Sequence, residues 1–217
     1  MMDFRLYNTR VRIVAGMLAC MKEKPFRELK DKDIIAKAQV SSRTFYHYYK
    51  DRNDLLDLLE KHMLEGLQEA MARDFEAVKA LHGAPDREDV YELADPAFKH
   101  VLEFCEENKE AAQVLLSDNG DLRFERKVKE LSIAEFKKGA KYLTGNPDFE
   151  IDDPVFLESY VTKIFSLIEY WLMMSDIVAP RKIREYIGKV QVQSPFDMLQ
   201  EQARSSRSGT IRIENAY

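Results

Sequence analysis

The stretch that most restricts the fold of this chain runs from Asp33 to Arg52. It reads DIIAKAQVSSRTFYHYYKDR, and its apolar residues have the spacing of two short helices that pack against a third. The outward positions of the second helix carry hydroxyls, an Arg, a His and Tyr in place of the usual Glu, Lys and Ala: Ser42, Arg43, Thr44, Tyr46 and His47. Such side chains contact phosphate oxygens and base edges. The stretch therefore predicts a helix-turn-helix whose recognition helix covers about residues 42–49.

Helical periodicity dominates the rest of the chain, and no convincing alternation of a strand is present. We expect an all-α fold with a head in residues 1–52, a connecting helix at about 51–80, a body in 53–201 and a mobile tail in 202–217. The sequence predicts one helix across 85–107, further helices at about 109–117, 124–143, 155–174 and 180–190, and loops at 82–85 and 144–154.

Charge is unevenly distributed between the head and the remainder of the chain. Residues 1–52 hold 12 Lys and Arg against 6 Asp and Glu, a balance of +6, which leaves −11 of the total of −5 for the other residues. A basic head on an acidic body fits a nucleic-acid-binding domain joined to a domain of another kind.

No apolar stretch is long enough for a transmembrane helix, and the first residues lack a secretory signal, so we expect a cytoplasmic protein that does not enter a membrane. Cys20 and Cys105 read as reduced buried thiols, with redox sensing as the alternative.

The residues around the predicted turn also carry a family resemblance. The run from Ala38 to Leu56, AQVSSRTFYHYYKDRNDLL, resembles the signature of TetR/AcrR-type transcriptional regulators, roughly A-G-V-S-x-x-T-F-Y followed by a basic residue and an acidic-Leu-Leu start of the next helix. The resemblance covers about the first 65 residues. One departure is Gln39, where the family usually has a Gly that accepts positive φ at little cost, so we expect a tighter or rearranged turn. Another is Lys30, where a Thr often caps the second helix; Asp31 is expected to be the N-cap instead.

The resemblance implies a TetR-like architecture, with an N-terminal three-helix DNA-binding domain followed by a C-terminal helical bundle that binds a ligand and dimerises. It suggests that Ser42, Arg43 and His47 face base edges, and that Lys32 reaches a phosphate or a base. The expected contacts to the sugar-phosphate backbone are Thr44, Tyr46, Tyr48 and Arg52. Tyr48 and Tyr49 could instead be packing residues, and Phe45 belongs to the core.

The function implied by the resemblance is that of a homodimeric repressor. It would bind a palindromic operator in double-stranded DNA and respond to a small hydrophobic effector. The expected lining of an effector pocket is apolar and could equally be close-packed core: Phe98, Leu102, Phe124, Phe136, Tyr160, Phe165 and Trp171. The very apolar segment at 155–174 predicts a dimer interface that includes Ile164, Ile168 and Trp171.

Nothing in the sequence favours catalysis. No His follows a Glu by three residues, and the H-E-x-x-H, G-x-S-x-G and glycine-rich phosphate motifs are missing. We therefore predict no catalytic residue, no metal and no cofactor, and we interpret His62 and His100 as ordinary surface residues. The main alternative to a DNA-binding regulator is a helical adaptor or co-regulator that keeps the fold and acts through protein contacts. An all-α enzyme with a dispersed site is a third possibility.

Overall fold

The computed structural model describes residues 4–79, 87–144, 146–174 and 178–200 of the chain. Within these ranges the chain forms helices and no strand, which confirms the predicted all-α fold. In chain order the helices are α1 (Phe4–Glu23), α2 (Asp31–Ala38), α3 (Ser42–Tyr48), α4 (Arg52–Lys79), α5 (Arg87–Ala97), α6 (Lys99–Glu107), α7 (Lys109–Leu116), α8 (Leu122–Leu143), α9 (Pro154–Met174) and α10 (Pro180–Val192). The loop predicted at 82–85 and the tail at 202–217 lie outside the described residues.

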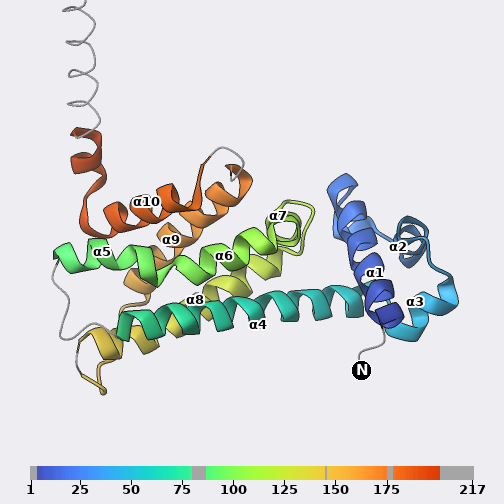
Figure 1. Ribbon diagram of the computed structural model, residues 1–217, viewed down its shortest axis with the longest axis horizontal. Helices are drawn as coiled ribbons and strands as arrows, with labels where there is room; N and C mark the ends of the chain where they lie inside the picture. Colours follow the sequence, from blue (N-terminus) through green and yellow to red (C-terminus); the bar gives the residue numbers. More distant parts are fainter. Residues whose placement is uncertain (1–3, 80–86, 145, 175–177, 201–217) are drawn as a thin grey trace, which may run out of the picture.

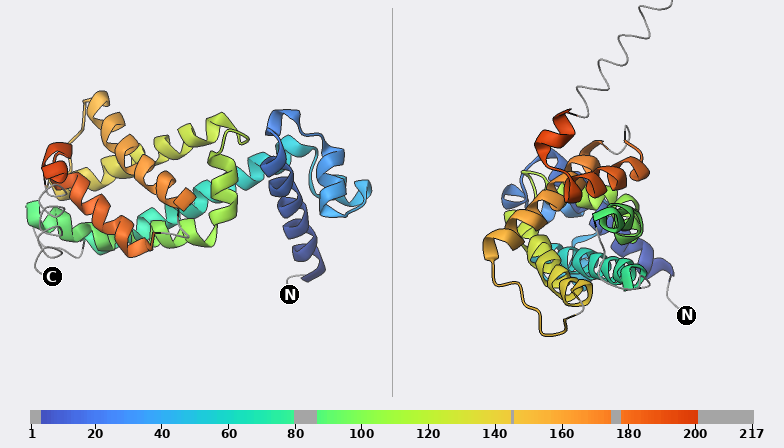
Figure 2. Two further views of the ribbon diagram at one scale, coloured as in Figure 1. Left: turned by 90° about the horizontal axis from the view of Figure 1, so that it is seen from above. Right: turned by 90° about the vertical axis from the view of Figure 1, so that its left-hand side faces the viewer.

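The long helix α4 connects the two parts of the molecule (Figure 1). Its N-terminal end lies beside α1, α2 and α3, which form the head, while the rest of α4 packs against α5, α6 and α8. Seen from above, α1 to α3 stand apart from the helices of the body along the axis of α4 (Figure 2). The position of α4 makes it the covalent link through which a movement in the body can reach the head.

The head has a small, closely packed apolar core. Ile13 and Met17 of α1, Ile34 of α2 and Phe45 of α3 are fully buried in it. Helices α1 and α2 approach so closely that a Cβ added at Gly16 would lie 2.8 Å from the backbone nitrogen of Ala38. That contact distance leaves no room for a side chain, so the glycine allows α2 to sit directly on α1.

The helix predicted across residues 85–107 is two helices in the structure, α5 and α6, and the prediction of one helix is wrong. The break is at Phe98, whose backbone has φ −129° and ψ 11° and interrupts the helix just after Pro96. The new N-terminus of α6 is satisfied from α4, because the Asp74 carboxylate accepts hydrogen bonds from the backbone N–H groups of His100 (2.8 Å) and Val101 (3.0 Å). Pro96 is a local sign of this break that the sequence prediction missed, whereas the cap has no local sign, because Asp74 lies 26 positions earlier in the chain than His100.

The head also contacts the body at a second place, at α7 and the turn that follows it. The Phe26 backbone N–H donates to the Asn119 carbonyl at 2.8 Å, and Lys22 of α1 forms an ion pair with Glu110 of α7. Figure 1 shows α7 as the body helix beside α1. A shift of α7 would therefore act on the head directly, in addition to any movement of α4.

Candidate DNA interface and body cavity

The turn between α2 and α3 is left-handed at Gln39. This residue has φ 53° and ψ 46°, and it is the only non-glycine residue with positive φ among those described. The Arg12 guanidinium of α1 donates to the carbonyl oxygens of Ala38 (2.8 Å) and Gln39 (2.6 Å). Gln39 thus adopts a conformation that favours glycine. Arg12 binds the carbonyl oxygen of Gln39 and that of the residue before it, and so holds the turn in place.

Helix α3, the predicted recognition helix, begins with a side-chain cap. The Ser41 hydroxyl accepts a hydrogen bond from the Thr44 backbone N–H at 3.0 Å and lies 2.8 Å from the Thr44 hydroxyl oxygen. Phe45 is fully buried and Tyr49 is nearly so, with their rings 5.9 Å apart, so both are packing residues. This anchoring fixes which face of α3 points outward, and the residues exposed on it are Ser42, Arg43, Tyr46 and His47.

Asp31 does not cap α2 as the sequence predicted. Lys30 occupies the N-cap position without a side-chain cap, and its backbone N–H donates to Asp33 at 3.0 Å. The Asp31 carboxylate instead accepts the Tyr46 hydroxyl and the Arg52 backbone N–H, both at 3.0 Å. The hydrogen bond to Asp31 raises the pKa of the Tyr46 hydroxyl. One carboxylate therefore fixes α3 and the start of α4 relative to α2.

The cations expected to contact DNA differ in how freely they can move. Lys32 and Arg43 are exposed. Arg52 is half-buried: its guanidinium donates to the Phe26 carbonyl at 2.9 Å and stacks 5.1 Å from the Phe26 ring. Tyr48 is also half-buried, with the Arg10 guanidinium 5.4 Å from its ring. Arg52 and Tyr48 are thus oriented by the protein before any partner arrives, whereas Arg43 is not.

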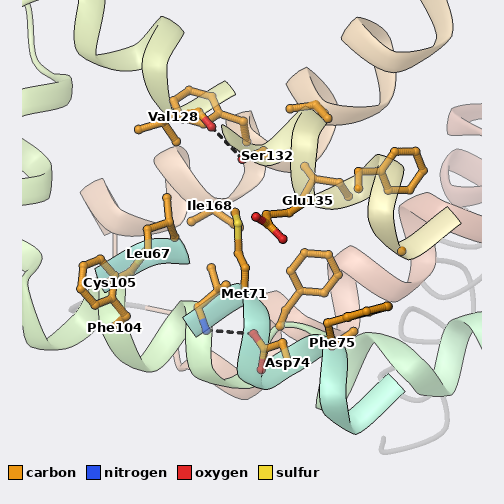
Figure 3. Close-up of a pocket in the computed structure, with 18 of the residues that line it drawn as sticks. Leu67, Met71, Asp74, Phe75, Phe104, Cys105, Val128, Ser132, Glu135 and Ile168 are labelled. Atoms are coloured by element: carbon orange, nitrogen blue, oxygen red, sulfur yellow. Dashed lines mark hydrogen bonds between the residues drawn. The ribbon is translucent and has the colours of Figure 1, made fainter. Parts of the chain in front are cut away.

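The body encloses a cavity of about 290 Å³ between α4, α5, α6, α8 and α9 (Figure 3). Five of the expected pocket residues line it: Phe98, Phe124, Phe136, Tyr160 and Phe165. Leu102 and Trp171 do not line it, so the expectation that these two residues form part of the pocket is corrected. Leu102 is 0% exposed and Trp171 1% exposed in the core, where the Trp171 indole N–H donates to the Val178 carbonyl at 2.8 Å.

The expected dimer-interface residues also lie inside the chain. Ile164 and Ile168 face the cavity, and Trp171 is part of the core. Ile164 and Trp171 are buried in their own chain and present little surface to a second copy, so the expectation for these two residues is corrected. Ile168 is half-buried, and its place in an interface stays a prediction. The apolar excess of α9 is used partly inside the body, and at its C-terminal end the helix exposes Tyr170 (64%) and Met173 (46%).

Sequence reasoning missed the carboxylates in the cavity wall, which are Asp74, Glu135 and Glu169. A signal for two of them was present. Glu135 follows Leu131 by four residues, and Glu169 follows Phe165 by four, so each acidic residue occupies the apolar face of its helix. Asp74 lies beside His100, whose Nδ1 is 2.7 Å from the carboxylate. His100 is therefore paired with a buried acid and is not an ordinary surface residue.

Neither a metal site nor a membrane-spanning helix is present in the described ranges. No group of three or more His, Cys, Asp or Glu side chains there is arranged to hold a metal ion. Among the same residues, no helix has the length and apolar character needed to cross a membrane.

Comparison with known proteins places the head in a family. Residues 13–59 match the model of bacterial regulatory proteins of the tetR family. Across 87% of its length the chain is 21% identical to the HTH-type transcriptional regulator YxbF of Bacillus subtilis, and it spans 46% of that relative, less than half of its length.

Solved structures share the fold over most of the chain. A TetR transcriptional regulator from Streptococcus agalactiae superposes with a TM-score of 0.55 at 17% identity, covering 88% of this chain and 97% of that one. The fatty acid degradation regulator FadR from Bacillus halodurans superposes with a TM-score of 0.60 at 12% identity, covering 86% and 96%. At these identities the likeness concerns the fold.

Proposed function

Because the chain belongs to the TetR family of transcriptional regulators, we propose that it is a repressor that binds a palindromic operator as a homodimer and releases it when a small hydrophobic effector enters the body cavity. The observation that carries this proposal is the outward face of α3. Its exposed hydroxyl, guanidinium and imidazole groups sit on a helix whose orientation is set by Phe45, Asp31 and the Arg12 contacts. A rigid helix with such a surface is suited to the major groove of DNA.

We assign the reading of sequence mainly to Arg43, with Ser42 and His47 beside it. An exposed guanidinium can donate a bidentate pair to guanine, and the short Ser42 side chain lets the start of α3 approach the groove. Arg52 is assigned to phosphate, because its half-buried guanidinium still has N–H groups beyond the one used on Phe26. Contacts to bases and contacts to phosphate differ in their salt dependence, which makes the two assignments separable.

The test is to select bound fragments from the source genome and measure affinity against salt concentration. Arg43→Ala should weaken binding to the selected site by about 1–3 kcal/mol and relax its preference over other DNA. Arg52→Ala should weaken specific and non-specific binding alike and lower the salt slope by roughly one. Arg126→Ala, an exposed residue of α8 in the body, is the matched control and should change neither. If Arg43→Ala keeps its preference for the selected site, the assignment to base reading is wrong.

We further propose that the two-fold partner covers the exposed apolar side chains at the end of α9 and on α10, namely Tyr170, Met173, Met174 and Tyr186. A dimer would place two recognition helices on half-sites about 34–36 Å apart or at a multiple of that spacing. Tyr170→Glu should shift the protein toward monomers in sedimentation, because it places a charge in the contact. A wild-type protein that sediments as a monomer at micromolar concentration would refute this part of the proposal.

Coupling between cavity and DNA is proposed to run through α4 and through the contact of α7 with the head. Residues of α4 line the cavity at one end of the helix and pack in the head at the other, as Met71 and Leu55 do. A hundredfold loss of DNA affinity requires about 2.7 kcal/mol of coupling, within the usual range. Reciprocity gives the test: a compound that releases the operator must bind the DNA-free protein more tightly by the same factor. A compound that fills the cavity with equal affinity in both states would show that the two sites are not coupled.

A further inference from the structure

The chemical character of the cavity wall indicates the class of molecule that fits it. We propose that the cavity binds an apolar cation, meaning a molecule with a hydrocarbon or aromatic body and a protonated amine directed at Glu135. This inference rests on the proposed role of the cavity as an effector site, and it goes further by naming the charge of the ligand.

The charged residues that line the cavity all have the same sign. They are Asp74, Glu135 and Glu169, and no Lys, Arg or His is among the described lining residues. The rest of the wall is almost entirely aliphatic, aromatic and methionine side chains. A ligand must therefore bury an apolar body and tolerate carboxylates at close range.

Three uncharged polar side chains of the wall donate hydrogen bonds to other groups of the protein. The Ser132 hydroxyl donates to the Val128 carbonyl at 2.9 Å, and the Tyr160 hydroxyl donates to the Gln191 side chain at 2.9 Å. The Gln191 amide donates in turn to the Ile187 carbonyl at 3.3 Å. The carboxylates of the wall add acceptor capacity, which suits a ligand that supplies a strong donor.

Glu135 offers that acceptor. Lys138 (2.7 Å) and Gln68 (3.0 Å) both donate to its Oε1, and neither of them lines the cavity. Oε2 accepts no hydrogen bond from the described residues, and Figure 3 shows the Glu135 carboxylate directed toward Met71 across the cavity. Burial by itself would raise the pKa of Glu135, but the hydrogen bonds from Lys138 and Gln68 outweigh it and lower the pKa, so the group stays ionised.

Glu169 adds a second acceptor from α9. It accepts no hydrogen bond within the described part of the chain. Burial, together with the neighbouring Glu125, raises its pKa, although Lys129 acts in the opposite direction. An anionic ligand would bring its own charge to a wall that contains two such carboxylates and no cationic side chain among the described lining residues. An ammonium group, in contrast, would restore the solvation that the carboxylates lost on burial.

The experiment compares three probes that share one chain and differ in charge: decylamine, decanol and decanoate. Binding is measured by calorimetry with the 217-residue protein in the absence of DNA, below the concentration at which any probe forms micelles. We expect decylamine to bind at least about tenfold more tightly than decanoate. Glu135→Gln should lower the affinity for decylamine about tenfold and leave the affinity for decanol unchanged. The unchanged decanol affinity would also show that the cavity of the variant is intact. Glu130→Gln, on the exposed side of α8, is the matched control and should change neither affinity.

The outcomes separate this inference from the proposed function. Tighter binding of decanoate than of decylamine, binding of none of the three, or a preference for decylamine that survives Glu135→Gln would each overturn the inference. If decanoate binds more tightly and also releases the selected operator, the repressor proposal stands and the ligand charge is wrong. If decylamine binds as expected but leaves DNA affinity unchanged, the ligand class stands and the effector coupling fails.

Discussion

The head and the body of this molecule use apolar side chains in opposite ways. In the head, Ile13, Met17, Ile34 and Phe45 are fully buried against one another, and a glycine is needed where α1 meets α2. In the body, the aromatic residues of several helices surround a cavity of about 290 Å³. Close packing makes the head rigid, as the proposed DNA-reading surface requires, whereas unfilled volume in the body leaves room for the proposed ligand.

Polar side chains also differ between the head and the body. Polar contacts in the head fix backbone positions, as when Asp31 joins α2 to α3 and α4, or when Arg12 holds the turn at Gln39. The wall of the body cavity leaves one oxygen of Glu135 without a hydrogen bond from the described residues. The comparison suggests that substitutions in the head act mainly on stability and DNA geometry, and that substitutions in the cavity act mainly on ligand affinity.

The largest effect is expected from matched phenylalanine truncations in the two regions. Phe45→Ala should cost about 3–5 kcal/mol, because the side chain is fully buried in a close-packed core. Phe136→Ala should cost roughly half as much, since this half-buried ring faces an existing cavity and stacks on Tyr160 at 4.3 Å. Amide hydrogen exchange should show faster exchange in α1 to α3 for Phe45→Ala alone. Equal costs for the two substitutions would contradict the difference in packing.

The next effect concerns the ion pair that joins α4 to α8. Glu60 is 1% exposed, its Oε2 accepts a hydrogen bond from Lys127 at 2.5 Å, and its Oε1 has no partner among the described residues. Lys127→Ala would leave this carboxylate without its cation and should cost about 1–3 kcal/mol in urea denaturation. Arg126→Ala, one position earlier and exposed, should cost little. A loss no larger than that of the control would mean that solvent replaces Lys127.

Glu60 also predicts a pH dependence with a definite sign. Burial raises its pKa above the ordinary value of 4.5, although Lys127 acts in the opposite direction. Between the unfolded and folded pKa values the folded protein binds more protons, so this group lowers stability as pH rises through that window. Measured from pH 4.5 toward neutrality, the unfolding free energy of Glu60→Gln minus that of the wild type should therefore increase. A constant difference would show that Glu60 titrates equally in both states.

Much of the head could be predicted from the sequence, because its signals are local. The spacing of the apolar residues from Ile34 to Phe45 predicted two helices. The same spacing predicted which face of α3 is polar. The capping role of Asp31 was predicted wrongly, since its partners Tyr46 and Arg52 lie 15 and 21 residues away and depend on how the helices pack.

The body was harder to predict, because a cavity depends on the relative placement of four or more helices. Hydrophobic periodicity shows that Phe165 and Trp171 are both inward, but it does not show that one lines a void and the other fills the core. Glu135 and Glu169 differ, because the sequence holds a local signal for them that the prediction missed. Each sits on the apolar face of a helix, and an acidic residue at such a position is a local sign of a polar site within a core.

The smallest predicted effect tests whether Arg12 compensates for Gln39. A left-handed residue other than glycine destabilises the fold by about 1–2 kcal/mol. Glycine removes that cost but loses about 0.5–1 kcal/mol, because it has more freedom in the unfolded chain. Gln39→Gly should therefore stabilise the protein by about 0.5–1 kcal/mol. If Arg12 holds the turn, Arg12→Ala should weaken binding to the selected DNA site by letting the Gln39 turn relax and α3 shift. The double variant should recover most of that affinity, because glycine keeps the left-handed turn without help. Affinities of the two single variants and the double variant decide the matter: a double variant as weak as Arg12→Ala would mean that Arg12 contacts DNA itself.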